Sequence, residues 1–409
     1  MPASGSRDTR APTRTGALSG LSVLELGEMV AAPYCAKLLG DLGADVLKVE
    51  SPGAGDPARL RGPFPDAEPH PERSALFLYL NTSKRSITLD LESEEGRRIF
   101  ARLAEGVDVL VEDRMPGALA DLGLSYDALA ARNPGIVVTS ITPFGQTGPN
   151  RRHRSQHLNL YHSAGHTSPF GAPASEDGRA PSKAGGYLGE YDAGLTAALG
   201  TLAAVLGREL SGRGQHVDVS KQEAMMGLER VTIGRYANEP DPFAGRPPGG
   251  LVRAKDGYFI FTILQPHQWE GMVETMGRPA WADASWCQDP AERRARAEEI
   301  QRHIGEWAAG LTRDEIYHRA QAHGAPVAPV RSVSEVMEWN QARERELFRE
   351  LVHPEVGRHT QPTAPYRFSE TPWAGSAAPL LGEHNRAVYV DALGYSDQDL
   401  VRLSDSGAI

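Results

Sequence analysis

The sequence contains little cysteine and no long apolar run. Only Cys35 and Cys287 occur in 409 residues, too few for a disulfide framework, so a reducing, cytoplasmic location is expected. The longest apolar stretch, within residues 195–206, is interrupted by Thr and Gly and is shorter than a membrane span, so no membrane partner is expected. Residues 1–19 contain no apolar segment and are expected to form a disordered tail.

An excess of positive charge is also missing. Asp and Glu number 53 against 43 Lys and Arg, which gives a net charge of −10 and argues against nucleic acid as the main partner. A small polyanion needs only a local cluster of positive charge, such as Lys84-Arg85 or residues 151–154, although each cluster also fits a solvated loop. The His and Cys residues lack metal-ligand spacing, so no metal site is expected.

The first 150 residues have the pattern of a parallel α/β fold. Residues 21–50 read as strand, helix and strand, which predicts a βαβ unit in a doubly wound parallel sheet. The pattern repeats, with Ser93 as a predicted helix N-cap. The first strand is not followed by G-x-G-x-x-G, so NAD binding is not indicated. Further strands are predicted at 85–91, 107–112, 136–141 and 216–220, and helices at 33–42, 93–103 and 126–132.

A smaller unit is predicted after a segment rich in Pro and Gly. Residues 238–250 read NEPDPFAGRPPGG, a composition typical of a domain boundary. Beyond it the patterns predict strands at 257–264 and 327–330, with helices at 268–276, 290–309 and 313–323.

Ten sequence blocks, in order from about residue 20 to 403, carry a resemblance to a known family. They include VLELGEMVAAPYCAKLLGDLGADVLKVE, NTSKRSITLDLES, NPGIVVTSITPFGQTGP, SGRGQHVDVS and PLLGEH. The chain resembles the family III CoA-transferases (the CaiB/BaiF type), which include formyl-CoA transferase, carnitine CoA-transferase and 2-methylacyl-CoA racemase. The resemblance implies a Rossmann-like large domain (residues 20–228 and 331–409) and an inserted α+β domain (residues 229–330). It also implies an interlocked ring homodimer, or a heteromer with a paralogue.

The resemblance implies covalent catalysis by a carboxylate. In transferases of this family an Asp attacks the acyl-CoA thioester, and an anhydride and an enzyme–CoA thioester follow. Counting back from the turn at 211–215, and separately from Gly194, places Glu190 at that Asp position. Glu keeps the acid but moves it by one methylene. Acyl-CoA and a carboxylic acid are then substrates, with no tightly bound cofactor. Alternatively, Glu190 only complements the dipole of the helix that it begins.

Other site residues are implied by the same resemblance. It implies contacts to the oxyanion or substrate at Gln156, His157, Gly249 and Gly250. Where formyl-CoA transferase carries basic residues this chain has Ser51, Glu92 and Asp121. The two acids among them would repel the CoA 3′-phosphate unless Arg114, Arg151 or Arg154 compensates. Contacts to CoA are implied at Val30, which replaces a family Gln, and at Ala31, Leu89, Asp113, Arg114, Leu122 and Arg154.

Two alternatives to transfer remain. The racemase branch of the family carries a His–Asp pair after the GQTGP block, and ungapped alignment puts Gln156 at the His position, with His157 next to it. A Gln cannot move a proton, but a one-residue gap would restore His157 for α-carbon isomerisation together with Glu190. The other alternative is a non-catalytic subunit of a hetero-oligomeric transferase.

Overall fold

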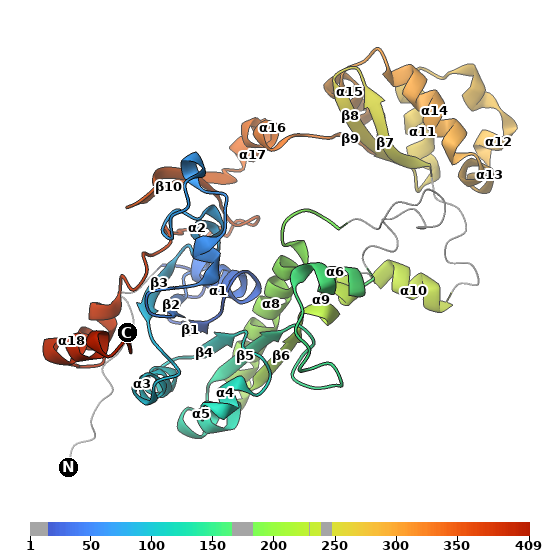
Figure 1. The fold of residues 1–409 in the computed structure, drawn as a ribbon. Helices are drawn as coiled ribbons and strands as arrows, with labels where there is room; N and C mark the ends of the chain where they lie inside the picture. The colour runs from blue at the N-terminus through green and yellow to red at the C-terminus, as the bar shows by residue number, and fades with distance from the viewer. Residues whose placement is uncertain (1–14, 166–182, 229, 239–247) are drawn as a thin grey trace. The chain divides into compact units, whose positions relative to one another are not determined.

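The chain folds into two compact units. The computed structural model describes residues 15–165, 183–228, 230–238 and 248–409. The large unit comprises Met1–Arg230 and Glu346–Ile409, and the small unit comprises Val231–Arg345 (Figure 1). Most of the expected tail, residues 1–14, lies outside the described residues. Its last part, residues 15–19, forms a turn in which the Leu18 N–H donates to the carbonyl of Leu42 at 2.9 Å.

The large unit is built on a six-stranded parallel sheet, as the βαβ pattern predicts. The strand order is β3-β2-β1-β4-β5-β6, and every pairing is parallel. The order reverses between β1 and β4, which makes their carboxyl ends the expected place for a ligand. The strands are β1 (Ser22–Leu26), β2 (Asp45–Glu50), β3 (Lys84–Thr88), β4 (Val109–Glu112), β5 (Val137–Thr142) and β6 (His216–Ser220).

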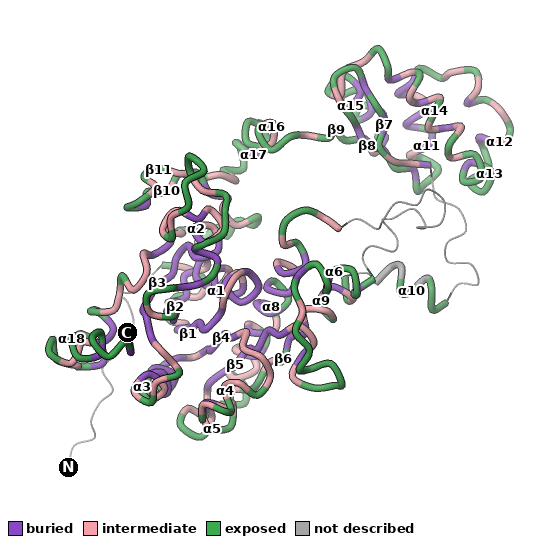
Figure 2. Tube along the Cα trace, viewed as in Figure 1, coloured by how far each residue is buried: buried purple, intermediate pink, exposed green. Residues whose placement is uncertain are grey.

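Helices cover both faces of this sheet, because successive strand side chains point to opposite faces. Val23, Val109 and their neighbours pack against α1 (Ala31–Asp41) and α8 (Leu188–Ser211). Leu24, Leu110 and their neighbours pack against α3 (Glu94–Glu105), α5 (Tyr126–Arg132) and the C-terminal segment. The strands are buried along most of their length (Figure 2).

The remaining elements of the large unit are short. They are η1 (Pro57–Leu60), η2 (Pro65–Ala67), α2 (Ala75–Leu80), α4 (Ala118–Asp121), α6 (His157–Ser163), α9 (Lys221–Leu228), the antiparallel pair β10 (Phe348–His353) and β11 (Gly357–Pro362), η4 (Ala387–Ala392) and α18 (Asp397–Asp405).

Helix α8 is the one described helix that is long and apolar enough, by length and composition, to cross a membrane. It packs against α1, β5 and β6 inside the α/β unit. The contact with α1 depends on Gly194, where a Cβ would lie 2.6 Å from the Ala31 carbonyl oxygen.

The small unit has its own sheet and core. Its strands β7 (Gly249–Ala254), β8 (Gly257–Thr262) and β9 (Val327–Pro329) pair antiparallel in that order. Gly249 and Gly250, which end the predicted boundary segment, instead pair with β8 as the first residues of β7. The helices from Arg230 to Glu344 are α10 (Arg230–Asn238), α11 (Pro266–Thr275), η3 (Ala280–Asp283), α12 (Ser285–Gln288), α13 (Pro290–Ala295), α14 (Ala297–Ala308), α15 (Arg313–Ala322), α16 (Val333–Glu338) and α17 (Asn340–Glu344).

Candidate active site

Glu190 lies in the first turn of α8, as the sequence predicts, and it has a partner that the sequence did not suggest. The Lys221 Nζ donates to Glu190 Oε2 at 2.7 Å, and the two side chains are only 15% and 11% exposed. Lys221 is the first residue of α9, directly after β6. The positive end of the α8 dipole and the Lys221 ammonium both interact favourably with a negatively charged side chain.

A glycine allows this pair to form. Gly189, just before Glu190, faces Met225 of α9, and a Cβ at Gly189 would lie 2.2 Å from the Met225 sulfur. Gly189 thus leaves room for the buried Met225 side chain where α8 meets α9. The close crossing therefore brings together two residues that are 31 positions apart in the sequence.

His157, and not Gln156, is the residue that approaches Glu190. Gln156 is exposed as the N-cap of α6, whereas the side chain of His157 is buried beside Tyr161 and Tyr187, each with ring centroids 5.8 Å away. Burial lowers the pKa of His157, while the negative charge of Glu190 opposes this shift. The imidazole is therefore neutral at pH 7 and sits within electrostatic reach of the carboxylate.

The loop between β1 and α1 carries two of the predicted CoA contacts. The side chains of Val30 and Ala31 are both buried, so these two residues can meet a ligand only through their backbone. Two carboxylates hold the loop: Asp113 Oδ2 accepts from the Glu28 N–H and Asp56 Oδ1 from the Met29 N–H, both at 2.9 Å. Met29 has φ of 61°, a left-handed conformation that needs such support.

Asp113 connects this loop to the Glu190–Lys221 pair. Burial raises the pKa of Asp113 to about 7, and the positive charge of Lys221 acts against that rise. Arg114, the next residue, forms an ion pair with Glu28 at 2.8 Å. Electrostatic interactions thus link Glu190 to His157, and Asp113 to both Lys221 and Arg114.

A buried ionic network beneath the loop was missed by sequence reasoning. Lys48 Nζ lies 2.9 Å from both Glu25 and Asp56, and Lys84 Nζ lies 2.7 Å from Glu25. Burial opposes the charge on Lys48, but Asp56 and Glu25 outweigh it and raise its pKa, whereas burial lowers the pKa of Lys84 to about 8. The signal was present, because Glu25 and Lys48 interrupt apolar strands where an unpaired charge would be very unfavourable.

Leu89, Leu122 and Arg114 line a cavity of about 380 Å³ at the carboxyl ends of β1, β2 and β4. We call it the nucleotide cavity, because this is where open parallel sheets bind nucleotides. Its volume is within the range of small-molecule sites, roughly 300–1,000 Å³. Leu26, Val49 and Leu119 complete an apolar floor.

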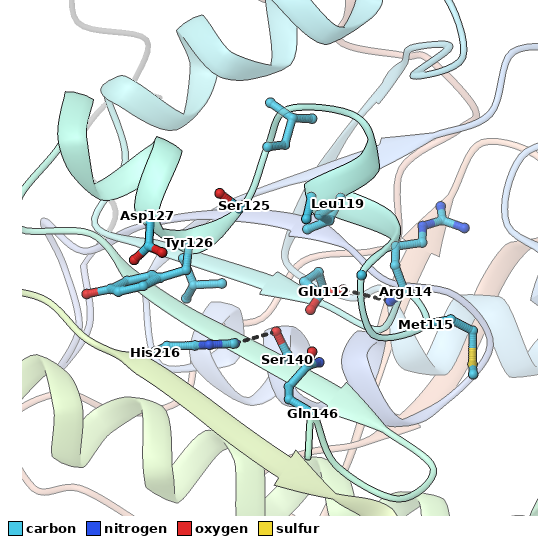
Figure 3. Close-up of a pocket in the computed structure, with 14 residues that line it drawn as sticks. Glu112, Arg114, Met115, Leu119, Ser125, Tyr126, Asp127, Ser140, Gln146 and His216 are labelled. Atoms are coloured by element: carbon cyan, nitrogen blue, oxygen red, sulfur yellow. Dashed lines mark hydrogen bonds between the residues drawn. The ribbon is translucent and has the colours of Figure 1, made fainter. Parts of the chain in front are cut away.

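A second cavity, of about 300 Å³, shares Arg114 and Leu119 with the first. Figure 3 shows His216, Ser140 and Glu112 along its wall, with His216 Nε2 and Ser140 Oγ 2.8 Å apart. Glu112 accepts a hydrogen bond from the Arg114 N–H at 2.7 Å, which orients the start of the Arg114 loop.

The other sequence candidates belong to other segments of the chain. Arg154 is exposed in the loop after β5, and Gly249 and Gly250 belong to the small unit. Burial raises the pKa of the Cys35 thiol to about 12, so it cannot serve as a thiolate nucleophile. No group of three or more His, Cys, Asp or Glu residues in the described part of the chain is placed to hold a metal ion.

Comparisons with known proteins agree with this geometry. Residues 18–385 match the family described as CoA-transferase family III. Formyl-CoA:oxalate CoA-transferase of Streptomyces coelicolor is 34% identical, over 96% of this chain and 99% of that enzyme. The succinyl-CoA–L-malate CoA-transferase beta subunit of Chloroflexus aurantiacus is 32% identical, over 95% and 97%. A CAIB/BAIF family protein from Brucella suis superposes with a TM-score of 0.80 at 29% identity, over 93% of this chain and 100% of that one. The chain belongs to CoA-transferase family III and is an enzyme of that family.

Proposed function

We propose that Glu190 is the covalent carboxylate of a CoA transfer between an acyl-CoA and a carboxylic acid. Its oxygen attacks the thioester carbonyl carbon, and the C–S bond breaks. CoA departs as the thiolate, and the acyl group remains on Glu190 as a mixed anhydride. The thiolate then attacks the glutamyl carbon, which releases the donor acid and forms a glutamyl-CoA thioester. An acceptor carboxylate reverses both steps, and Glu190 is regenerated without net proton transfer.

The ion pair with Lys221 is the observation that supports this proposal. The lysine holds the Glu190 carboxylate in one place while the substrate binds. When the carboxylate attacks, negative charge moves from Glu190 to the former thioester oxygen, and a lysine about 3 Å away can stabilise that oxyanion. Lys221 must remain protonated, since a free amine would capture the anhydride or thioester as an amide.

CoA is proposed to enter as a substrate, with no tightly bound cofactor. The nucleotide cavity would take its adenosine end, with Leu89 and Leu122 against the base. The loop from Glu28 to Ala31, held by Asp113, then offers its backbone to the pantetheine arm on the way to Glu190. Gln156, Arg154, Gly249 and Gly250 stay proposed contacts.

The test is the intact mass of the protein after exposure to donor acyl-CoA. The names of the relatives give the first donors and acceptors: formyl-CoA with oxalate, and succinyl-CoA with L-malate. We expect a mass increase equal to covalently held CoA, mapped to Glu190, and its loss in Glu190→Gln, which keeps the shape but not the nucleophile. Full activity in Glu190→Gln would overturn the proposal. Glu190→Asp is the matched variant that retains the acid.

We also propose a homodimer in the cytoplasm. Leu195, Leu199, Leu206 and Leu210 of α8 are 57–90% exposed, an unusual concentration of apolar surface on one helix that a second chain would cover. One relative carries the name of a beta subunit, so a heteromer with a paralogue is the competing assembly. Sedimentation of the purified chain alone distinguishes the two.

The isomerase and non-catalytic alternatives are not favoured. Both relatives named above are CoA-transferases, and a carboxylate with a lysine partner occupies the critical position. Isomerisation by His157 together with Glu190 can be tested directly, because it would incorporate deuterium at Cα of the acyl-CoA without an acceptor acid.

A further inference from the structure

The nucleotide cavity has an acidic rim. Ser51 follows β2, Asp90 and Glu92 follow β3, and Asp121 ends α4. All four residues line the cavity, and among its lining residues Arg114 is the one cation. Side-chain carboxylates of Asp and Glu are normally ionised at neutral pH.

The cations near this acidic rim are already engaged by other groups. Arg114 is paired with Glu28 at 2.8 Å. Arg59, which neutralises the lining residue Glu50 at 2.7 Å, is fully buried. Arg97, on the first turns of α3, directs its guanidinium to the carbonyl oxygens of residues 91 and 92, at 3.1 and 2.7 Å.

The protein group beside a ribose decides whether a free hydroxyl or a phosphate is accommodated there. In open parallel sheets a carboxylate near the ends of the strands accepts hydrogen bonds from the free ribose hydroxyls, whereas a guanidinium there accommodates a ribose phosphate. Asp90, Glu92 and Asp121 give this cavity the first kind of chemistry. A dianionic phosphate among them would be repelled, and the nearby guanidinium groups already have partners.

We propose that the nucleotide cavity selects a CoA carrier without its 3′-phosphate, so that 3′-dephospho-CoA binds more tightly than CoA. This inference rests on the proposed function, because it assigns the cavity to the adenosine end of the substrate. The pantetheine arm and the thioester are common to both carriers, so the chemistry at Glu190 is the same with either.

The test is calorimetric titration of the full-length protein with CoA and with 3′-dephospho-CoA at low ionic strength. We expect the dephospho form to bind about tenfold more tightly, since a few like charges several ångströms away give repulsion of that order. The difference should shrink as salt is added. Equal affinities, or tighter binding of CoA, would overturn the inference and leave the proposed transferase intact. Failure of both carriers to bind would reject the inference and also count against the proposed function.

Charge-neutral variants separate this repulsion from other causes. Asp121→Asn and Glu92→Gln should each tighten CoA binding about threefold. Neither variant should tighten 3′-dephospho-CoA binding, because the amide oxygen replaces a stronger, charged acceptor for the ribose hydroxyls. Glu105→Gln is the matched control, because this exposed α3 residue pairs with Arg132 and does not line the cavity. If the control tightens CoA binding as much as Asp121→Asn does, the effect belongs to overall charge and the inference fails.

Discussion

Substitution of Gly194 tests how closely α1 and α8 must approach. A Cβ at this position would lie 2.6 Å from the Ala31 carbonyl oxygen and 3.1 and 3.2 Å from atoms of Tyr34. The oxygen belongs to the backbone at the start of α1, so it cannot move aside as a flexible side chain would. Gly194→Ala therefore forces the two helices apart near Glu190, one turn away.

The expected size follows from two opposing effects. Overpacking a buried contact destabilises by about 1–3 kcal/mol, while replacing glycine by alanine inside a helix stabilises by about 0.5–1 kcal/mol. Gly207→Ala in the same helix is the matched control. Its Cβ would meet a single atom of Gln215 at 3.9 Å, an ordinary contact, so only the stabilising effect applies. The two variants should then differ by the overpacking effect alone.

Thermal unfolding of both variants beside the parent is the assay. We expect Gly207→Ala to melt slightly above the parent and Gly194→Ala below Gly207→Ala by at least about 2 °C, the shift expected from 1 kcal/mol in a unit of this size. Because Ala31 and Glu190 both flank the contact, Gly194→Ala should also slow formation of the CoA adduct. A Gly194→Ala protein that melts as high as Gly207→Ala and forms the adduct at the parent rate would refute the argument.

Substitutions at three further positions are informative. Lys221→Met should lower the rate of adduct formation by about 10- to 100-fold, with partial recovery in Lys221→Arg, and unchanged single-turnover rates would exclude a role for the ion pair. The pKa of Asp113 is raised to about 7 by burial, so the folded state retains a proton that the unfolded state loses above about pH 4, and stability falls as pH rises between these values. Melting curves from pH 4 to 7 should show a smaller decline in Asp113→Asn than in the parent. The pKa of His157 is lowered by burial, so stability should fall as pH drops below about 6.5, where only the unfolded state gains the proton. His157→Gln should reduce that acid-side loss, and identical profiles would contradict the burial of a neutral imidazole.

Local sequence was sufficient for most of the large unit. The predicted helix at 126–132 matches α5, the strand at 216–220 matches β6, and Ser93 caps α3 by accepting from the Gly96 N–H at 2.9 Å. These elements follow from apolar periodicity and from side chains that satisfy the nearest backbone groups. Strand β7 was not anticipated, because Pro and Gly at its start resemble a turn and only pairing with β8 stabilises it.

For the candidate active site, too, some features follow from local sequence and others only from the tertiary structure. The sequence by itself determined the family, the parallel sheet and the position of Glu190 in the first turn of α8, because these depend on residues that are close together along the chain. Tertiary structure decided that Lys221 pairs with Glu190 and that His157, not Gln156, approaches the carboxylate. It also decided that Arg114 meets Glu28. These contacts join residues on different elements, and tertiary packing, which a local sequence pattern cannot specify, brings those elements together.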